Sequence, residues 1–387
     1  MRYRWDVIVV GAGPAGSTAA AILARHGLRV MLIDREEFPR DKACGDVVPL
    51  GCFLELDKIG FPTAGLERFQ VRHIVLEGSE RARRTFDLAE RQDPHGSIGT
   101  CVVSRTVFDQ ALSQHALTCG ADYTILNARG PIVDSGRVIG VTGTDGNQSV
   151  QFYSSIVIAA DGATSVIARA LDGGQKRDAQ WAVALRGYVD TDVDLDQTIE
   201  LAFLDHIQLG YAWFFPMATR RANVGLGMRS DFYKRQNRTL NQLLSDYLAL
   251  PEIAGRIGRN PVEHLQSWPI PFFTFEKQRV FDGALLAGDA GGFVHPITAA
   301  GIHPAIMTGK CAAEAAIHAL QIGDVSRTGL SRYTQLWRDA LTDDFQPAVT
   351  AATLATLFPH LVSAALLSTP EPRPGTKTSW LDSLGKF

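Results

Sequence analysis

The sequence predicts an α/β fold in which a parallel sheet is interleaved with an antiparallel sheet and followed by a helical C-terminus. Residues 7–10, Val-Ile-Val-Val, form a β-branched run that is too short for a helix and is typical of a buried parallel strand. Three glycines in G-x-G-x-x-G spacing follow directly, at Gly11, Gly13 and Gly16. Much later, residues 176–275 alternate between apolar and polar residues, as in an antiparallel sheet with one covered face.

The glycine turn lies between a strand and a helix predicted over residues 14–26, which is the context of a dinucleotide site. Gly11 allows the tight turn, Gly13 lets the backbone approach a pyrophosphate, and Gly16 lets the helix pack on the strand. The phosphates would lie at the helix N-terminus, where free N–H groups and the macrodipole favour negative charge. Asp34 ends a second buried strand about twenty residues further on, where this unit binds a ribose hydroxyl.

The composition of the 387-residue chain is ordinary for a soluble protein, and the length allows more than one domain. A formal net charge of −3 gives no electrostatic reason to expect nucleic acid as a partner. The five cysteines are odd in number and include no C-x-x-C pair, so neither a disulfide framework nor a metal site is predicted. The first strand follows Met1 too closely for a signal peptide, which predicts a cytoplasmic location.

Residues 348–367 carry no formal charge and are long enough to span a bilayer. The segment is rich in Ala and Thr, and Pro359 interrupts it. Our interpretation is a buried or groove-forming helix pair, with peripheral membrane contact as the alternative.

The remaining elements follow in chain order. A short helix before residue 60 should bury one apolar face made of Phe53, Leu54, Leu56 and Ile59. Strands are expected within residues 61–95, at 102–105, in a meander over 130–146 and at 155–160, with a helix from about residue 107 to 119. The later part should contain a helix over 239–250, a buried strand at 283–290 and a helix over 299–320.

These elements predict an interleaved pair of domains and a C-terminal extension. The nucleotide-binding domain takes residues 1–60, 96–175 and 276–330. The second sheet takes residues 61–95 and 176–275, and residues 331–387 form the C-terminal helical segment and tail.

Two later segments should converge on the glycine turn. Asp161-Gly162 and Gly288-Asp289 each place an aspartate directly after a buried strand, where its carboxylate could reach a sugar hydroxyl. Either segment alone could be a plain turn. In this order, the three segments resemble the flavin monooxygenase superfamily with the para-hydroxybenzoate hydroxylase-type fold. The resemblance implies a Rossmann-like FAD-binding domain, an interleaved antiparallel substrate domain, and contact of FAD with Arg105, which alone would read as a surface charge.

Three further motifs are similar to those of the geranylgeranyl reductase family. Residues 39–46 match its P-x-x-x-x-C-G segment, residues 211–216 with 223–227 match its Y-x-W-x-F-P…G-x-G motif, and residues 293–302 are similar to its flavin-contacting loop. His295 stands where that family often has Asn, and Ala300 replaces its usual Glu. Both departures fall where substrate and flavin would meet, and so they bear on the identity of the substrate.

The resemblance also implies a set of site residues. Cys44 and His295 would be catalytic, with a small buried hydrophobe and a packed histidine as the alternative readings. Tyr211, Trp213 and Phe215 would bind substrate, although alternate aromatic residues on a strand are also ordinary core. The residues implied for FAD are Gly11, Gly13, Ala15, Gly16, Asp34, Arg35, Cys44, Gly45, Arg105, Asp161, Gly162, Gly288, Asp289, Pro296, Gly301 and Ile302.

The function implied is reduction of a carbon–carbon double bond in a hydrophobic prenyl or natural-product-like substrate, free or carrier-bound, by hydride from reduced FAD. An FAD-dependent monooxygenase of secondary metabolism is the alternative, because the same fold serves both chemistries. Halogenation ranks lower, since residues 59–98 contain no lysine to match that family's essential one. A non-catalytic flavin-binding scaffold ranks last. No second dinucleotide fingerprint appears, so NAD(P)H reacting transiently and a ferredoxin-type donor are equally compatible.

Overall fold

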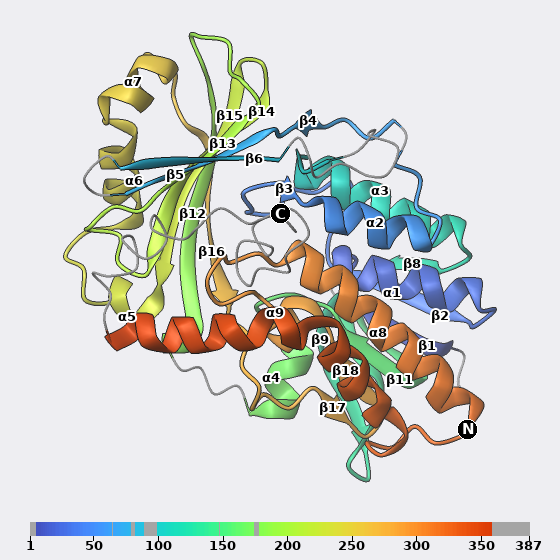
Figure 1. The fold of residues 1–387 in the computed structure, drawn as a ribbon. Helices are drawn as coiled ribbons and strands as arrows, with labels where there is room; N and C mark the ends of the chain where they lie inside the picture. The colour runs from blue at the N-terminus through green and yellow to red at the C-terminus, as the bar shows by residue number, and fades with distance from the viewer. Residues whose placement is uncertain are drawn as a thin grey trace.

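The computed structural model describes residues 5–63, 65–78, 82–88, 99–146, 148–173 and 178–357. Within them the chain forms two large sheets, one of eight strands and one of seven, with a small three-stranded sheet beside them. Figure 1 shows the two large sheets side by side, with most helices on the first. The small sheet consists of β3 (Val47–Val48), β7 (Cys101–Val102) and β4 (Phe69–Gln70).

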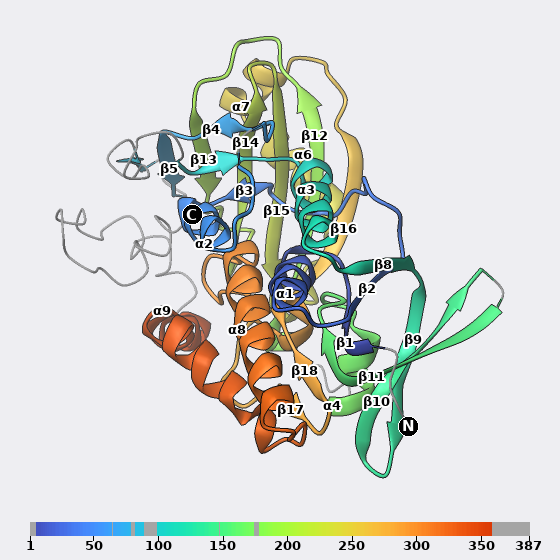
Figure 2. The same ribbon diagram turned by 90° about the vertical axis from the view of Figure 1, so that its right-hand side faces the viewer.

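The first sheet is built around β1 (Trp5–Val10), which pairs in parallel with strands distant in sequence. The strand order is β17 (Val280–Phe281), β18 (Ala284–Leu286), β11 (Gln148–Ala159), β1, β2 (Val30–Asp34) and β8 (Asp122–Ile125). The hairpin of β9 (Asn127–Asp134) and β10 (Arg137–Asp145) extends from β11, away from the C-terminal helices (Figure 2).

Both faces of the first sheet are buried, which explains the uninterrupted apolar run of β1. Val7 and Val9 pack beneath helices on one face, whereas Ile8 and Val10 pack on the other. The helices on the first face are α1 (Pro14–Arg25), α2 (Leu50–Lys58), α3 (Arg105–Thr118), α8 (Ile302–Gln321) and α9 (Arg332–Leu357), and the short α4 (Val166–Asp172) packs on the opposite face.

Helices α1 and α8 cross at very close range. A Cβ atom built on Gly309 of α8 would lie closer than 3.0 Å to the carbonyl oxygen of Ala15 in α1. Only a residue without a side chain allows this approach, so Gly309 fixes how the two helices meet.

The second sheet is antiparallel except for one parallel pair, as predicted for residues 176–275. Its order is β16 (Glu263–Pro271), β12 (Trp181–Asp190), β15 (Arg221–Arg229), β14 (Gly210–Ala218), β13 (Thr198–Ala202), β5 (His73–Glu77) and β6 (Arg83–Asp87). The helices α6 (Leu240–Leu248) and α7 (Pro251–Ile257) cover one face, whereas the short α5 (Ser230–Tyr233) follows β15. The other face turns toward the first sheet.

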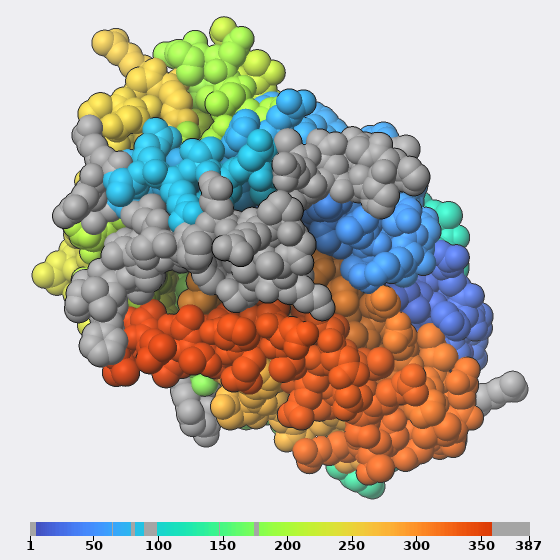
Figure 3. Space-filling model, in the orientation of Figure 1, coloured from blue at the N-terminus to red at the C-terminus, as the bar shows by residue number. Residues whose placement is uncertain are grey.

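Helix α9 runs across one face of the molecule as a continuous ridge (Figure 3). Near its end, Arg229 of β15 donates a hydrogen bond to the hydroxyl of Thr356 at 2.5 Å, which ties α9 to the second sheet. Of the apolar segment 348–367, residues 348–357 belong to α9, and residues from 358 onward, with the predicted tail, lie outside the described residues. No helix in the described ranges is both long and apolar enough to cross a bilayer.

Most predicted elements are found, with three local corrections. The helix predicted from residue 299 begins at Ile302, because Ala299 has a φ of 55° and Gly301 is the N-cap. Helix α3 begins at Arg105, two residues earlier than expected, so the strand predicted at 102–105 ends as β7 at Val102. Leu54 is 41% exposed and lies off the apolar face of α2. The domain boundaries stay a prediction, although the first sheet draws its strands from all three segments assigned to it.

Candidate active site

A cavity extends from the glycine turn after β1 to the inner face of the second sheet. It brings together most of the residues predicted from sequence: Gly11, Gly13, Ala15, Asp34, Arg35, Cys44, Gly45, Arg105, Asp161, Gly162, Tyr211, Trp213, Phe215, Gly288, Asp289, Gly301 and Ile302. Gly16, His295 and Pro296 are not among its lining residues.

The glycines of the turn have steric roles that match their predicted ones. Gly11 has a φ of 98° and touches the backbone at Ala160 so closely that a Cβ would not fit. Gly16 lies against the carbonyl of Gly11, which lets α1 pack on the strand. The carboxylate of Asp34 accepts a hydrogen bond from the Ala12 amide at 2.8 Å and thereby fixes the turn.

Two helices begin at this cavity without a capping side chain. The N-caps of α1 and α8 are Gly13 and Gly301, neither helix has an acidic residue in its first turn, and both glycines line the cavity. Uncapped N–H groups at a helix N-terminus attract anionic groups. A Cβ on Gly162 would meet no atom within 4 Å, so the backbone is open there too. This arrangement fits a dinucleotide, because its pyrophosphate is anionic and could lie at one of these helix N-termini.

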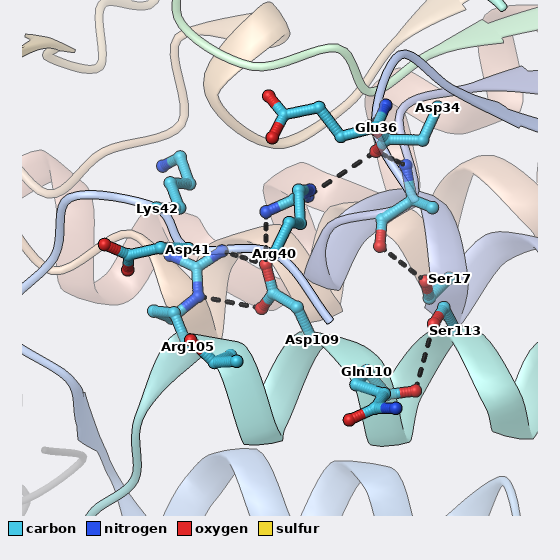
Figure 4. A network of polar contacts seen from close by, with 12 residues as sticks. Ser17, Asp34, Glu36, Arg40, Asp41, Lys42, Arg105, Asp109, Gln110 and Ser113 are labelled. Atoms are coloured by element: carbon cyan, nitrogen blue, oxygen red, sulfur yellow. Dashed lines mark hydrogen bonds and ion pairs between the residues drawn. The ribbon is translucent and has the colours of Figure 1, made fainter. Parts of the chain in front are cut away.

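A buried ion-pair network supports the middle of the cavity (Figure 4). Arg105 donates two hydrogen bonds of 2.7 Å to Asp109, one turn further along α3. Arg40 donates to Asp109 at 3.1 Å and lies 3.5 Å from Asp34. Arg105 is 3% exposed and Asp109 is fully buried, so the surface-charge reading of Arg105 is wrong. The i, i+4 spacing of Arg105 and Asp109 was a sequence signal for this pair that our reading missed.

The guanidinium of Arg105 also contacts the thiol of Cys44. Burial lowers the pKa of Arg105, but the charge of Asp109 and the contact with Cys44 outweigh it and raise this pKa above its ordinary value. Arg105 therefore remains a cation beside Cys44 at every pH at which the protein is folded.

The two predicted aspartates differ in their surroundings. Asp161 accepts hydrogen bonds from the Ser165 hydroxyl at 2.5 Å and the Val166 amide at 2.9 Å, so its carboxylate holds the start of α4. Burial raises its pKa. Asp289 lies 3.5 Å from the ammonium of Lys42, at the edge of the cavity.

The far end of the cavity is aromatic. Tyr211, Trp213 and Phe215 alternate along β14, and Trp213 stacks on Phe215 with ring centroids 5.9 Å apart. Tyr211 donates its hydroxyl hydrogen to the carbonyl of Thr298 at 2.6 Å, and burial raises its pKa, so the hydroxyl stays protonated. Sequence reading missed two further lining residues from the same sheet, Trp268 and Ile270, which stand at alternate positions of β16.

His295, predicted to be catalytic, does not line the cavity. Its ring is buried, and Nδ1 accepts hydrogen bonds from the amides of Ile297 and Thr298 at 3.3 and 3.1 Å. Nε2 lies 4.0 Å from the carboxylate of Asp344 in α9. The side chain thus stabilises the loop before α8 instead of lining the cavity, which does not support a role in proton transfer.

Asp46 is a fully buried carboxylate that sequence reading did not single out. Its Oδ2 accepts hydrogen bonds from the Tyr188 hydroxyl and the Asn223 amide, both at 2.9 Å, and Oδ1 has no hydrogen-bond partner among the described residues. Burial raises the pKa of Asp46 to about 6, although these two donors and the charges of Arg186 and Arg105 act to lower it.

The raised pKa of Asp46 predicts a pH dependence of stability. The folded protein holds this proton up to about pH 6, whereas the unfolded chain releases it near the ordinary pKa of 3.8. The stabilising contribution is therefore fully present below the unfolded pKa and is lost as the pH rises through the folded one. We expect the urea midpoint of Asp46→Asn to fall less than that of the wild type between about pH 4 and about pH 7. Parallel pH profiles of the two proteins would contradict the raised pKa.

Comparisons with known proteins agree with this geometry. The chain matches the family of FAD-binding domains over residues 4–340. It is 34% identical over 356 residues to digeranylgeranylglycerophospholipid reductase 2 of Methanopyrus kandleri, covering 90% of this chain and 86% of that protein. It is 30% identical to the menaquinone reductase of Mycolicibacterium smegmatis, with 89% and 83% covered.

A solved structure shares the whole architecture. The geranylgeranyl bacteriochlorophyll reductase-like protein of Thermoplasma acidophilum superposes with a TM-score of 0.81 and 25% identity, covering 94% of this chain and 89% of that one. With the cavity and its two uncapped helices, these similarities show that the chain belongs to the FAD-binding flavoprotein family, in its geranylgeranyl reductase-like branch.

Proposed function

We propose that the protein is an FAD-dependent reductase that saturates a carbon–carbon double bond in a hydrophobic, prenyl-like substrate. The observation that carries this proposal is the continuity of the cavity, which joins the nucleotide-binding turn to a wall of aromatic rings. An apolar pocket with few polar groups suits a hydrocarbon chain. The named activities of the relatives, reduction of a geranylgeranyl-bearing lipid and of menaquinone, support a prenylated substrate.

FAD would be held at four places along the cavity. Gly11, Gly13 and Ala15 would face the pyrophosphate at the start of α1, and Asp34 with Arg35 would lie beside the adenosine end. Asp289 would face the ribityl chain, and Gly301 with Ile302, at the N-terminus of α8, would face the pyrimidine edge. The cavity between these places is lined by Gly45, Arg105, Asp161 and Gly162. Pro296 and Gly16 do not line the cavity and would support the residues that do. When bound and reduced, FAD supplies a hydride equivalent.

Cys44 is the residue of this chain that we propose to act on the substrate. Its thiol lies in the cavity beside Arg105, close to the aromatic end. It can hold the proton at Sγ that is required by the second carbon of the double bond. Tyr211, Trp213 and Phe215 would exclude water and orient the chain of the substrate over this thiol.

The reductant and the setting of the reaction belong to the same proposal. NAD(P)H or a ferredoxin-type donor would deliver electrons from outside, and the substrate would arrive free or carrier-bound. We further propose that the protein works in the cytoplasm and contacts the membrane only peripherally, where prenyl lipids are found.

The decisive experiment is product mass analysis of prenylated lipids and quinones incubated with the reduced holoenzyme, with and without oxygen. We expect a gain of two hydrogens per reduced double bond under anaerobic conditions. Consumption of the substrate only in the presence of oxygen, with a gain of one oxygen atom, would establish the monooxygenase instead.

The same assay tests Cys44. We expect Cys44→Ala to keep FAD and to lose about 100-fold or more in turnover, which is the usual contribution of a positioned proton donor. Cys119→Ala, at the far end of α3, is the matched control and should turn over as the wild type does. Full turnover by Cys44→Ala would remove this thiol from the mechanism.

A further inference from the structure

A buried amide on the second sheet links the aromatic strand β14 to the segment that carries Cys44. Asn223 lies in the middle of β15, fully buried, and pairs in register with Tyr188 on one side and Phe215 on the other. Residues paired across antiparallel strands project to the same face, so all three side chains face the first sheet. Asn223 itself is not among the residues that line the cavity.

Both donor hydrogens of this amide and one acceptor position of its oxygen are used. Asn223 Oδ1 accepts from the indole N–H of Trp213 at 2.8 Å, and Nδ2 donates to the backbone carbonyl of Cys44 at 2.7 Å and to Oδ2 of Asp46 at 2.9 Å. The partners fix the orientation of the amide, because an indole N–H can only donate and a carbonyl can only accept.

The second sheet also holds the segment on either side of Cys44. Arg186 donates to the carbonyl of Lys42 at 3.2 Å, and Tyr188 donates to Asp46 at 2.9 Å. A Cβ on Gly45 would lie within 3.0 Å of the Phe215 ring, so the backbone rests directly on the aromatic wall. Asp46 has a positive φ of 64°, and its backbone carbonyl accepts a hydrogen bond from the backbone amide of Val103 at 2.8 Å. Among these contacts, the hydrogen bond from Asn223 is the one made to the backbone of Cys44 itself, so it bears directly on the distance of Cys44 from the rings.

We propose that Asn223 is a positioning residue that fixes the Cys44 thiol relative to the Trp213 ring, and that Asp46 orients this amide. The proposal rests on the proposed function, in which Cys44 meets the substrate above the aromatic wall. Asn223 would thus set how Cys44 meets the substrate without touching substrate or cofactor.

An exchange of the two side chains separates positioning from simple packing. Asn223→Asp keeps the acceptor for Trp213 but loses both donated hydrogen bonds and sets a carboxylate against Asp46. Adding Asp46→Asn restores the hydrogen bond between positions 46 and 223, because the new amide can donate to the new carboxylate while its oxygen still accepts from Tyr188. While the carboxyl at position 223 is ionised, neither variant can donate to the carbonyl of Cys44.

The readout is the rate at which iodoacetamide alkylates Cys44 in the holoenzyme, followed by mass spectrometry of its peptide, with Cys119 as an internal reference. We expect the single variant to lower the urea midpoint and to change the Cys44 rate by about fivefold or more. The double variant should regain the wild-type urea midpoint but keep the altered rate of Cys44 alkylation. Tyr188→Phe, which removes one donor to Asp46 and leaves Asn223 in place, should lower the midpoint and leave the Cys44 rate at the wild-type value.

Two results would overturn the proposal: a wild-type Cys44 rate in the double variant, or equal changes in the Cys44 and Cys119 rates. Should the single variant fail to fold, the double variant alone decides between these results. Alkylation needs no turnover, so an enzyme that fails to reduce any alkene still reports on Asn223. Failure of the proposed function and failure of this inference are thereby distinguished.

Discussion

The Arg105→Met variant is expected to unfold with a free energy about 3–5 kcal/mol below that of the wild type. The substitution keeps the length of the side chain but leaves the fully buried carboxylate of Asp109 with Arg40 as its remaining cation, at 3.1 Å. Removing one partner of a buried pair costs more than the pair contributes, because the other charge stays desolvated. Urea unfolding of the FAD-saturated protein measures the loss.

Two controls show whether burial is the cause. Arg105→Met combined with Asp109→Leu removes both charges and should recover most of the lost stability. Arg29→Met breaks an exposed pair with Asp6 and should leave the midpoint nearly unchanged. Equal losses of stability in the exposed and buried variants would show that the buried network of Figure 4 stabilises the fold no more than a surface ion pair does.

The Gly309→Ala variant should lose about 3 kcal/mol of stability and bind FAD more weakly. A single methyl group at this position meets the backbone of Ala15, which cannot move without shifting α1 against the sheet. Both helices begin at the cavity, so a small separation at their crossing displaces both N-termini. Urea unfolding and flavin titration of the apoprotein measure the two effects.

Gly255→Ala is the matched control for this substitution. Gly255 is also a helical glycine, in α7, but a Cβ there meets no atom within 4 Å. The added methyl group should raise stability by about 0.5–1 kcal/mol through helix propensity alone. A stable Gly309→Ala protein with unchanged FAD affinity would show that the two helices can separate without consequence for the site.

The sequence predicted those parts of the site that repeat a local pattern. The glycine turn, the segments Asp161-Gly162 and Gly288-Asp289, and the alternating aromatics of β14 are each contained in a few consecutive residues. All of them except Gly16 line the cavity. Asp46 and Asn223 were missed because their importance depends on contacts between residues far apart in sequence. Asp109 was missed although its i, i+4 spacing from Arg105 was a local signal. The surroundings of His295 could not be predicted for a related reason, since the direction of its ring depends on the turn before α8, which begins later than periodicity suggested.

The central position of β1 in the first sheet determines when the cofactor site can form during synthesis of the chain. The first strand lies between β2 and β11, and the helix after it is packed by α8, so its neighbours come from residues 30 to 321. Such long-range pairing cannot form while most of the chain is still on the ribosome. Flavin capture should therefore await synthesis of α8, and a nascent chain stopped before residue 302 should hold no cofactor. The glycine turn leaves the ribosome first, yet it is among the last parts of the site to be completed.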